Sequence, residues 1–217
     1  MCEPFISNHQ FNYMKKQAVT LEQALRTNAD PKVVESVRYS AITRIAELFP
    51  DAAPQQMQKL EAIFKLQSAD DISRQLKALE PDRTAFPPIT AKQIQKLFPK
   101  NKKLKLPDLE TIDFRHITYL SWVDIATNKL FIVYPAGGQF VGVEGKFTPT
   151  NKKSFCFVCN RYEELALFTA VTKKRPAHAS PDYYKAVGNY LCMNGQECNK
   201  NITDTAALER FIDAVIG

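Results

Sequence analysis

The chain has 217 residues, of which 45% are apolar and 24% charged, and its 29 Lys and Arg against 23 Asp and Glu give a formal net charge of +6. This composition supports a buried core and excludes an intrinsically disordered chain, and only seven glycines exclude a collagen-like or Gly-rich sequence. No apolar segment approaches the ~18 residues of a membrane span, and the N-terminus lacks the basic and apolar regions of a signal peptide. We therefore expect a cytoplasmic protein in a reducing compartment.

Residues 1–83 predict a small bundle of helices. Apolar residues recur there every three or four positions, a spacing that gives each helix one apolar face. In the first helix this stripe comprises Phe11, Met14, Ala18, Leu21 and Leu25. Asp30 followed by Pro31 predicts the start of a second helix, and Asp70-Asp71 predicts the cap of a fourth. We expect the apolar stripes to meet in the core of the bundle.

A lysine-rich joint follows the bundle. Residues 84–107 contain six lysines and no acidic residue. Thr90 and Gln93 have the spacing of a capping box, which predicts a short helix beginning there. A run of lysines this dense is typical of an anion-binding segment or, more often, of a solvated face.

From residue 112 onward the apolar period shortens toward two, which indicates strands. Strands are predicted over 116–124, 129–134 and 139–143, with turns at Asn128 and at Gly137-Gly138. Short turns between successive strands predict an antiparallel meander. Residues 205–216 return to a helical pattern.

Four of the five cysteines form two close pairs, Cys156-Phe-Val-Cys159 and Cys192-Met-Asn-Gly-Gln-Glu-Cys198. Two such pairs in a cytoplasmic chain favour a metal site over a redox pair or a coincidence. Four thiolates around one cation make a closed tetrahedral site, which is typical of one structural Zn²⁺. The wider second spacing leaves open that His178 replaces a cysteine, and Cys2 stands apart as a free thiol.

The order of these features predicts an α+β fold class. We expect an N-terminal helical bundle over 1–83 and an α/β domain over 84–217, with an antiparallel sheet and a treble-clef-like four-cysteine zinc finger over about 147–217. Asn160 and Asn199 directly follow the two cysteine pairs, and asparagine tolerates the left-handed geometry expected at such corners.

The sequence resembles the FusB-type elongation factor G-binding proteins. The resemblance is carried by Ser154-Phe-Cys-Phe-Val-Cys-Asn160, by Tyr183–Cys192, by Cys198-Asn199 and by the upstream segment 94–104. It implies a protein that binds elongation factor G through its zinc-containing C-terminal domain, on the C-terminal part of the factor. It further implies release of the factor from ribosomes stalled by fusidic acid, which is resistance by target protection without any covalent chemistry. A monomer in proximity to the ribosome, with neither membrane nor small-molecule substrate, is expected.

Five side chains are expected to contact the partner: Phe157, Tyr184, Lys185, Tyr190 and Phe211. Phe157 lies between two ligands, where an exposed aromatic ring would anchor a partner, although burial against the last helix is an equal alternative. Lys185 can meet an acidic surface, with Tyr184 and Tyr190 close in the sequence. Phe211 follows from the resemblance, whereas its place on the apolar face of the last helix favours the core.

Two other classes of function compete with this one. A zinc-containing RNA- or ribosome-binding module would also explain the lysine-rich joint, but no Gly-aromatic RNA signature is present. A metal-dependent enzyme is disfavoured, because four thiolates leave no open coordination position and the three histidines lie in no catalytic motif. The prediction is therefore a binding protein and not an enzyme.

Overall fold

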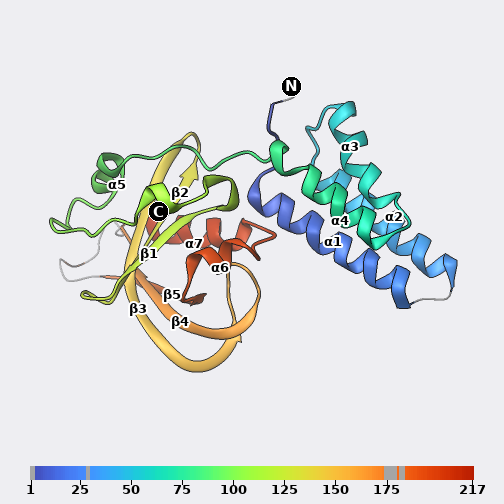
Figure 1. Cartoon of the computed structure of the whole chain (residues 1–217). Coiled ribbons are helices and arrows are strands. Elements are labelled where there is room, and N and C mark those ends of the chain that lie inside the picture. The colour runs from blue at the N-terminus through green and yellow to red at the C-terminus, as the bar shows by residue number, and fades with distance from the viewer. Residues whose placement is uncertain (1–2, 28–29, 174–179, 181–183) are drawn as a thin grey trace. The chain divides into compact units, whose positions relative to one another are not determined.

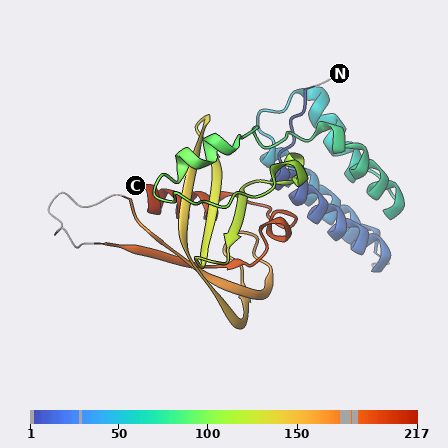
Figure 2. The same ribbon diagram turned by 60° about the vertical axis from the view of Figure 1, so that its left-hand side comes forward.

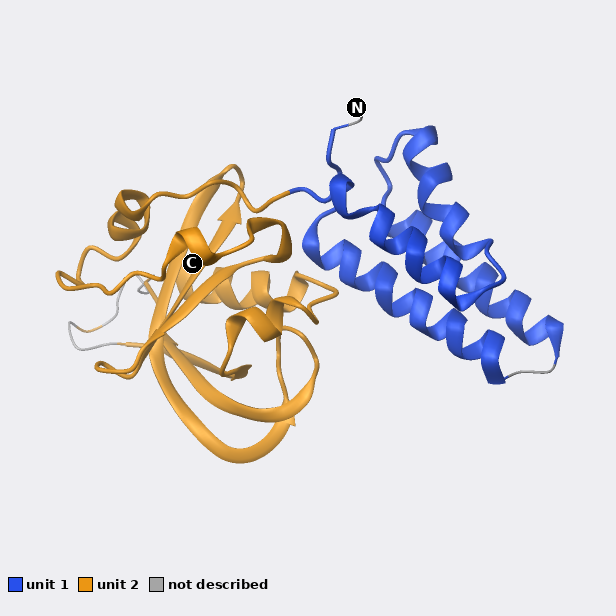
Figure 3. Ribbon diagram, in the orientation of Figure 1, with its two compact units in different colours: residues 1–84 blue, residues 85–217 orange. Residues whose placement is uncertain are grey.

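The structure, a computed structural model, describes residues 3–27, 30–173, 180 and 184–217. The chain forms two compact units, Met1–Thr84 and Ala85–Gly217 (Figure 3). Cys2 and His178 lie outside the described residues, so the alternative ligand and the free thiol named above have no structural account. Within the described part, each helix is too short or too polar to span a bilayer.

Four helices and one short turn make up the first unit (Figure 1): α1 (Asn8–Thr27), α2 (Pro31–Leu48), α3 (Pro54–Phe64), α4 (Ala69–Ala78) and the 3-10 turn η1 (Glu80–Asp82). The predicted apolar stripe of α1 is buried, apart from Leu25, which is half-buried. A parallel bridge between Ile6 and Arg83 joins the two ends of the unit. The predicted helical bundle is confirmed.

One predicted cap is correct and one is wrong. The Asp30 side chain accepts a hydrogen bond from the backbone N–H of Lys32 at 2.9 Å and so caps α2. Asp70 and Asp71 do not cap α4, because Ser68 holds the N-cap position. The two carboxylates lie instead in the first turn, where negative charge interacts favourably with the positive end of the helix dipole.

A buried guanidinium group ties α2 to the end of α3. Arg38 donates to the carbonyl oxygens of Phe64 and Leu66, the latter at 2.9 Å, and to the side chain of Gln67 at 3.1 Å. Carbonyl groups at a helix end have no partner within the helix, so these bonds satisfy groups that would otherwise be buried alone.

We expect Arg38→Leu to lower the unfolding free energy of the first unit by about 3 kcal/mol, because the carbonyl oxygens lose a charged donor. Urea unfolding followed by helical circular dichroism measures this loss. Trp122, the single tryptophan, lies in the second unit, and its fluorescence transition should stay in place. If only the fluorescence transition shifted, Arg38 would be stabilising the second unit, and the role assigned to it in the first unit would be wrong.

The second unit begins with α5 (Ala91–Leu97), whose start has the predicted capping box. Thr90 Oγ1 accepts from the Gln93 N–H at 3.3 Å, and Gln93 Oε1 accepts from the Thr90 N–H at 2.8 Å. Two 3-10 turns follow, η2 (Leu109–Thr111) and η3 (Phe114–His116). The first strand therefore starts later than predicted, because the Asp113 side chain caps η3 where an extended segment was expected.

The sheet has five antiparallel strands in sequence order: β1 (Leu120–Asp124), β2 (Lys129–Ala136), β3 (Gln139–Phe155), β4 (Tyr162–Val171) and β5 (Ala186–Cys192). Asn128 and Gly137-Gly138 form the first two turns with positive φ values of 50°, 57° and 77°, as predicted. The sequence did not indicate the long second half of β3, and it left β4 and β5 unassigned. The register of β3 shifts between Pro149 and Lys153, and such a shift breaks the alternation that marks a strand.

Both faces of the sheet are covered where β2 runs. Leu130 and Ile132 belong to the core that includes α7 (Ala206–Ile216), whereas Phe131 and Val133 belong to the core that includes α5. Alternate residues of a strand point to opposite faces, so α5 and α7 lie on opposite sides of the sheet (Figure 2). The α7 side also holds the four paired cysteines.

Candidate metal centre and partner surface

The first cysteine pair lies in a tight turn between β3 and β4. Cys156 directly follows β3, and its N–H donates to the carbonyl oxygen of Arg161 at 3.0 Å. Asn160 donates from its N–H to the Cys156 carbonyl oxygen at 2.9 Å and has a left-handed backbone with φ of 55°, as expected. This geometry turns Cys156 and Cys159 toward the same point.

The second pair joins the end of β5 to a short helix, α6 (Gly195–Asn199). Cys192 ends β5 and Cys198 lies on α6, whose first N–H groups are capped by the side chain of Asn194. Gly195 lies close to β1, and a Cβ atom there would lie 2.0 Å from the Ser121 Oγ atom, so a larger residue would require that side chain to rotate away. The helix is therefore held close to the sheet.

Asn199 differs from its prediction. It lies within α6 and not at a left-handed corner, and its side chain is buried. Its Oδ1 atom accepts from the N–H groups of Thr118 at 2.7 Å and Tyr119 at 3.2 Å, and its Nδ2 atom donates to the Tyr119 carbonyl oxygen at 2.9 Å. The carboxamide supplies a donor and an acceptor together, which fixes α6 to the backbone just before β1.

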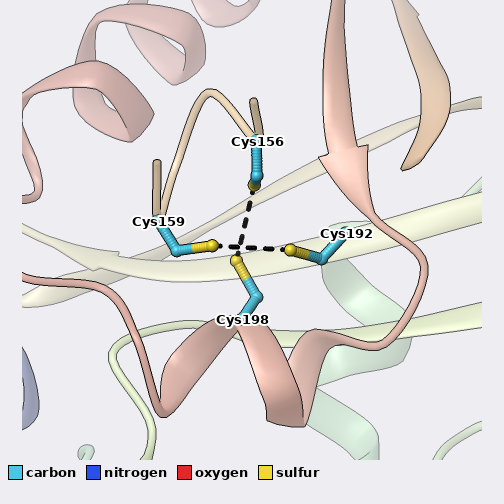
Figure 4. A group of neighbouring side chains, drawn as sticks. All are labelled: Cys156, Cys159, Cys192 and Cys198. Carbon is cyan, nitrogen blue, oxygen red and sulfur yellow. Dashed lines mark hydrogen bonds between the residues drawn. The ribbon is translucent and has the colours of Figure 1, made fainter. Parts of the chain in front are cut away.

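The four sulfur atoms lie within 4.8 Å of one another, and all four residues are buried (Figure 4). The Sγ–Sγ distance is 3.8 Å between Cys156 and Cys198 and 3.4 Å between Cys159 and Cys192. Zinc–sulfur bonds of about 2.3 Å in a tetrahedron place the sulfurs about 3.8 Å apart. The donor set and its dimensions therefore fit one Zn²⁺ ion.

The ionisation of each of these thiol groups depends on its neighbours in the cluster. Hydrogen bonds from the other thiols, with that of Cys159 the largest, lower the pKa of Cys156. The pKa of Cys192 and that of Cys198 are raised, chiefly because each interacts with the Cys156 sulfur. One negative charge in the cluster thus opposes further ionisation, and four thiolates together require a divalent cation to balance them.

Protons must leave the cluster when a cation binds, because only thiolates are ligands. The Cys192 thiol donates to the Glu163 carboxylate at 2.9 Å, so a proton acceptor lies beside one of the ligands. With four sulfurs as ligands the tetrahedron is complete, and the arrangement holds structure without offering a position for a substrate.

The expected contact residues fall into two groups, a first that is buried or half-buried and a second that is exposed. Phe157 is half-buried and its ring lies 5.2 Å from that of Phe211, which is itself only 3% exposed and packs on Phe168. Tyr184 is 74% exposed, Tyr190 is 47% exposed, and Lys185 is also exposed. The structure therefore presents the second group to solvent and places Phe211 in the core.

An exposed aromatic pair beside the metal centre was missed by the sequence analysis. Phe155 and Tyr162 are partners across β3 and β4, each is 59% exposed, and their ring centroids are 5.0 Å apart. Phe155 directly precedes the ligand Cys156. Alternate residues of a strand face opposite sides, and Cys156 is buried, so Phe155 would have been placed on the surface had the second half of β3 been recognised.

The second unit also has a basic hollow of about 1410 Å³ beside α5 and over β3 to β5. Six lysines line it: Lys96, Lys100, Lys129, Lys146, Lys173 and Lys185. Glu144 is the single acidic residue in its described lining, and this carboxylate already pairs with Lys129 at 3.1 Å. The hollow therefore carries a strong local positive charge, and Tyr184 is part of its wall.

Comparison with known proteins gives a consistent result for both units. Residues 5–87 match the family model of the N-terminal domain of elongation factor G-binding protein. Residues 95–212, more than half of the chain, match the model of the FBP C-terminal treble-clef zinc-finger. No curated protein matches the sequence.

The chain therefore belongs to the elongation factor G-binding protein family, a family that is not a known class of enzyme. Its cofactor is one structural zinc ion, held in the treble-clef finger that four buried cysteines form. Among solved structures, that of the fusidic acid resistance protein FusC is similar, with a TM-score of 0.80 and 28% identity over 98% of each chain. The FusB-type resemblance seen in the sequence is confirmed.

Proposed function

We propose that this chain binds translation elongation factor G and releases it from ribosomes on which fusidic acid has stalled it. The observation that carries the proposal is the match of both units to models of elongation factor G-binding proteins. The similarity to a fusidic acid resistance protein over nearly the whole chain supports the link to the drug. Resistance then follows from protection of the target, and the protein needs no catalytic group.

The contact surface proposed here lies on the second unit, facing the C-terminal part of the factor. Tyr184, Lys185 and Tyr190 supply exposed aromatic and basic groups, and the pair Phe155 and Tyr162 adds two rings beside the zinc knuckle. Exposed aromatic side chains at a rigid site are the usual anchors of protein interfaces. The basic hollow would attract an acidic partner and speed the encounter.

To release elongation factor G, the chain must bind two states of the factor with different affinities. A protein that bound the stalled and the free factor equally well would shift no equilibrium, so it must bind the departing conformation more tightly. In this proposal the protein acts as a monomer near the ribosome, with residues 1–83 and 84–217 as its domains. The zinc holds the contact surface of the second domain in shape.

A co-sedimentation experiment tests the proposal. Ribosomes, elongation factor G, GTP and fusidic acid are mixed and pelleted with increasing amounts of the full zinc-loaded chain. We expect the factor to move from the pellet to the supernatant as a complex with the chain. A factor that stays in the pellet, although the chain binds it when free, would contradict release but not binding. The absence of any complex at micromolar concentrations would contradict both.

RNA binding is the second candidate, and the lysine-lined hollow is the observation that favours it. Salt separates the two candidates, because counterion release makes RNA affinity fall steeply with ionic strength. Titration of ribosomal RNA and of elongation factor G at low and at high salt measures this difference. Tight and strongly salt-dependent binding to RNA, with none to the factor, would replace the leading proposal.

A further inference from the structure

A buried tyrosine beside the zinc site has a hydroxyl group for which the described residues supply no hydrogen bond. Tyr119 is fully buried, and within the described residues its hydroxyl oxygen has no hydrogen-bond partner. Buried polar groups nearly always have a partner, because leaving one unpaired costs the full penalty of removing it from water. An unpaired hydroxyl in the middle of a packed core therefore points to a partner that appears only when the site is loaded.

The neighbour that acts most directly on this hydroxyl is the Cys198 side chain. The Cys198 sulfur lies beside it and acts on it more strongly than the sulfurs of Cys156 and Cys192 do. Tyr119 and all four cysteines belong to one buried cluster. A tyrosine hydroxyl is a donor at neutral pH, and a zinc-bound thiolate has lone pairs and negative charge available to accept.

The position of the tyrosine is fixed by the residue next to the ligand. Asn199 follows Cys198 directly and makes two hydrogen bonds to the backbone of Tyr119, one to its N–H and one to its carbonyl oxygen. A further bond from Asn199 to the Gly195 carbonyl oxygen, at 2.9 Å, anchors the same side chain in α6. Ligand, anchor and tyrosine thus form one rigid group, although they come from segments 80 residues apart.

We propose that the Tyr119 hydroxyl donates a hydrogen bond to the zinc-bound Cys198 thiolate and thereby slows the loss of zinc. The bond holds the sulfur in its ligating position and occupies a lone pair that a competing proton or chelator would otherwise approach. Partners outside the ligand set commonly change metal affinity 10- to 100-fold. Tyr119 is then a positioning residue of the zinc centre, a role independent of elongation factor G.

The variant Tyr119→Phe removes only the hydroxyl oxygen and leaves the ring in place. In the full zinc-loaded chain, with an excess of a chromophoric chelator, we expect zinc release to be about tenfold faster than in the wild type. In cobalt-substituted protein we expect the thiolate-to-metal charge-transfer band to shift, because one sulfur loses a hydrogen bond. A purely structural role of the hydroxyl would leave this band unchanged.

Tyr134→Phe is the matched control. The Tyr134 hydroxyl bonds to Glu209 at 2.5 Å in the same unit, so its loss weakens packing without touching a cysteine. We expect unchanged zinc release and an unchanged cobalt band in this variant. Equal zinc release in Tyr119→Phe and the wild type, with identical cobalt spectra, would overturn the proposal.

A measurement on the unaltered chain keeps the proposal testable if Tyr119→Phe does not fold. In cadmium-substituted wild-type protein, the hydrogen-bonded hydroxyl proton should exchange slowly with water and show a scalar coupling to the cadmium nucleus. A slowly exchanging tyrosine hydroxyl proton without such coupling would show that the donor points elsewhere, and the proposal would fall.

Discussion

Replacing Cys198 with serine is expected to release the zinc ion and to unfold the second unit. Cys198 is fully buried, and its side chain belongs to the core that joins α6, α7 and the sheet. Structural zinc contributes apparent binding free energy on the order of 10 kcal/mol to a small domain, as much as a whole domain's net stability. Loss of one thiolate is therefore expected to cost more free energy than the net stability of the second unit.

Zinc content after gel filtration and the fluorescence of Trp122 measure the two parts of this expectation. Trp122 packs on Phe131 with ring centroids 5.2 Å apart, so its emission reports on the core of the second unit. Cys2→Ser is the control, because the sequence sets Cys2 apart from both pairs. A Cys198→Ser chain that lost zinc but kept native tryptophan emission would show that the metal does not hold the fold.

The first unit should keep its helices in the same variant. It has a separate core, formed between α1, α2, α3 and α4, and the described residues of this core include no cysteine. Helical circular dichroism should therefore fall only by the contribution of the second unit. Loss of all helical signal would mean that the two units unfold as one.

The sequence predicted those elements of the fold whose pattern lies within neighbouring residues of the chain. Helix α1 was found from its apolar stripe, and the Thr90–Gln93 capping box was found from two residues three positions apart. The second half of β3 was not found, because the register shift within it disrupts the alternation. Strands β4 and β5 were not found, because their pairing depends on partners distant in the sequence. Ser68 and Asp70 compete as helix caps with similar intrinsic preference, so sequence alone did not separate them.

The same distinction applies to the metal centre. Spacing alone identified the four cysteines, because a short turn between ligands leaves a local pattern. The hydrogen bonds between the Asn199 side chain and the backbone N–H groups of Thr118 and Tyr119 join residues 81 and 80 positions apart, and no local sequence pattern predicts them. The exposure of an aromatic residue also depends on tertiary packing, which is why Phe157 could not be assigned to surface or core beforehand. For Phe211 the apolar face of the last helix already favoured the core, where the structure places it.

A variant that reverses the charge at Lys185 and also carries Tyr190→Ala is expected to bind elongation factor G about 30-fold or more weakly than the wild type. This decrease corresponds to a loss of about 2 kcal/mol of binding free energy, as expected for an interface anchor. Both side chains are exposed on the second unit, so neither fills a position in its core. Their loss should therefore change the unfolding free energy by less than about 0.5 kcal/mol. Calorimetric titration of the factor into the variant, with urea unfolding beside it, separates affinity from stability.

Phe211 provides the contrasting case, because it is buried against Phe157 and Phe168. Phe211→Ala should cost about 3–5 kcal/mol of stability through the cavity it leaves, and binding should fail only as the unit unfolds. Phe211→Leu retains most of the volume and should bind the factor nearly as well as the wild type. If Phe211→Leu is stable but does not bind, the ring itself touches the partner, and the contact surface must include the core side of α7. If it binds while the Lys185 and Tyr190 variant does not, the exposed face of the second unit is where the factor docks.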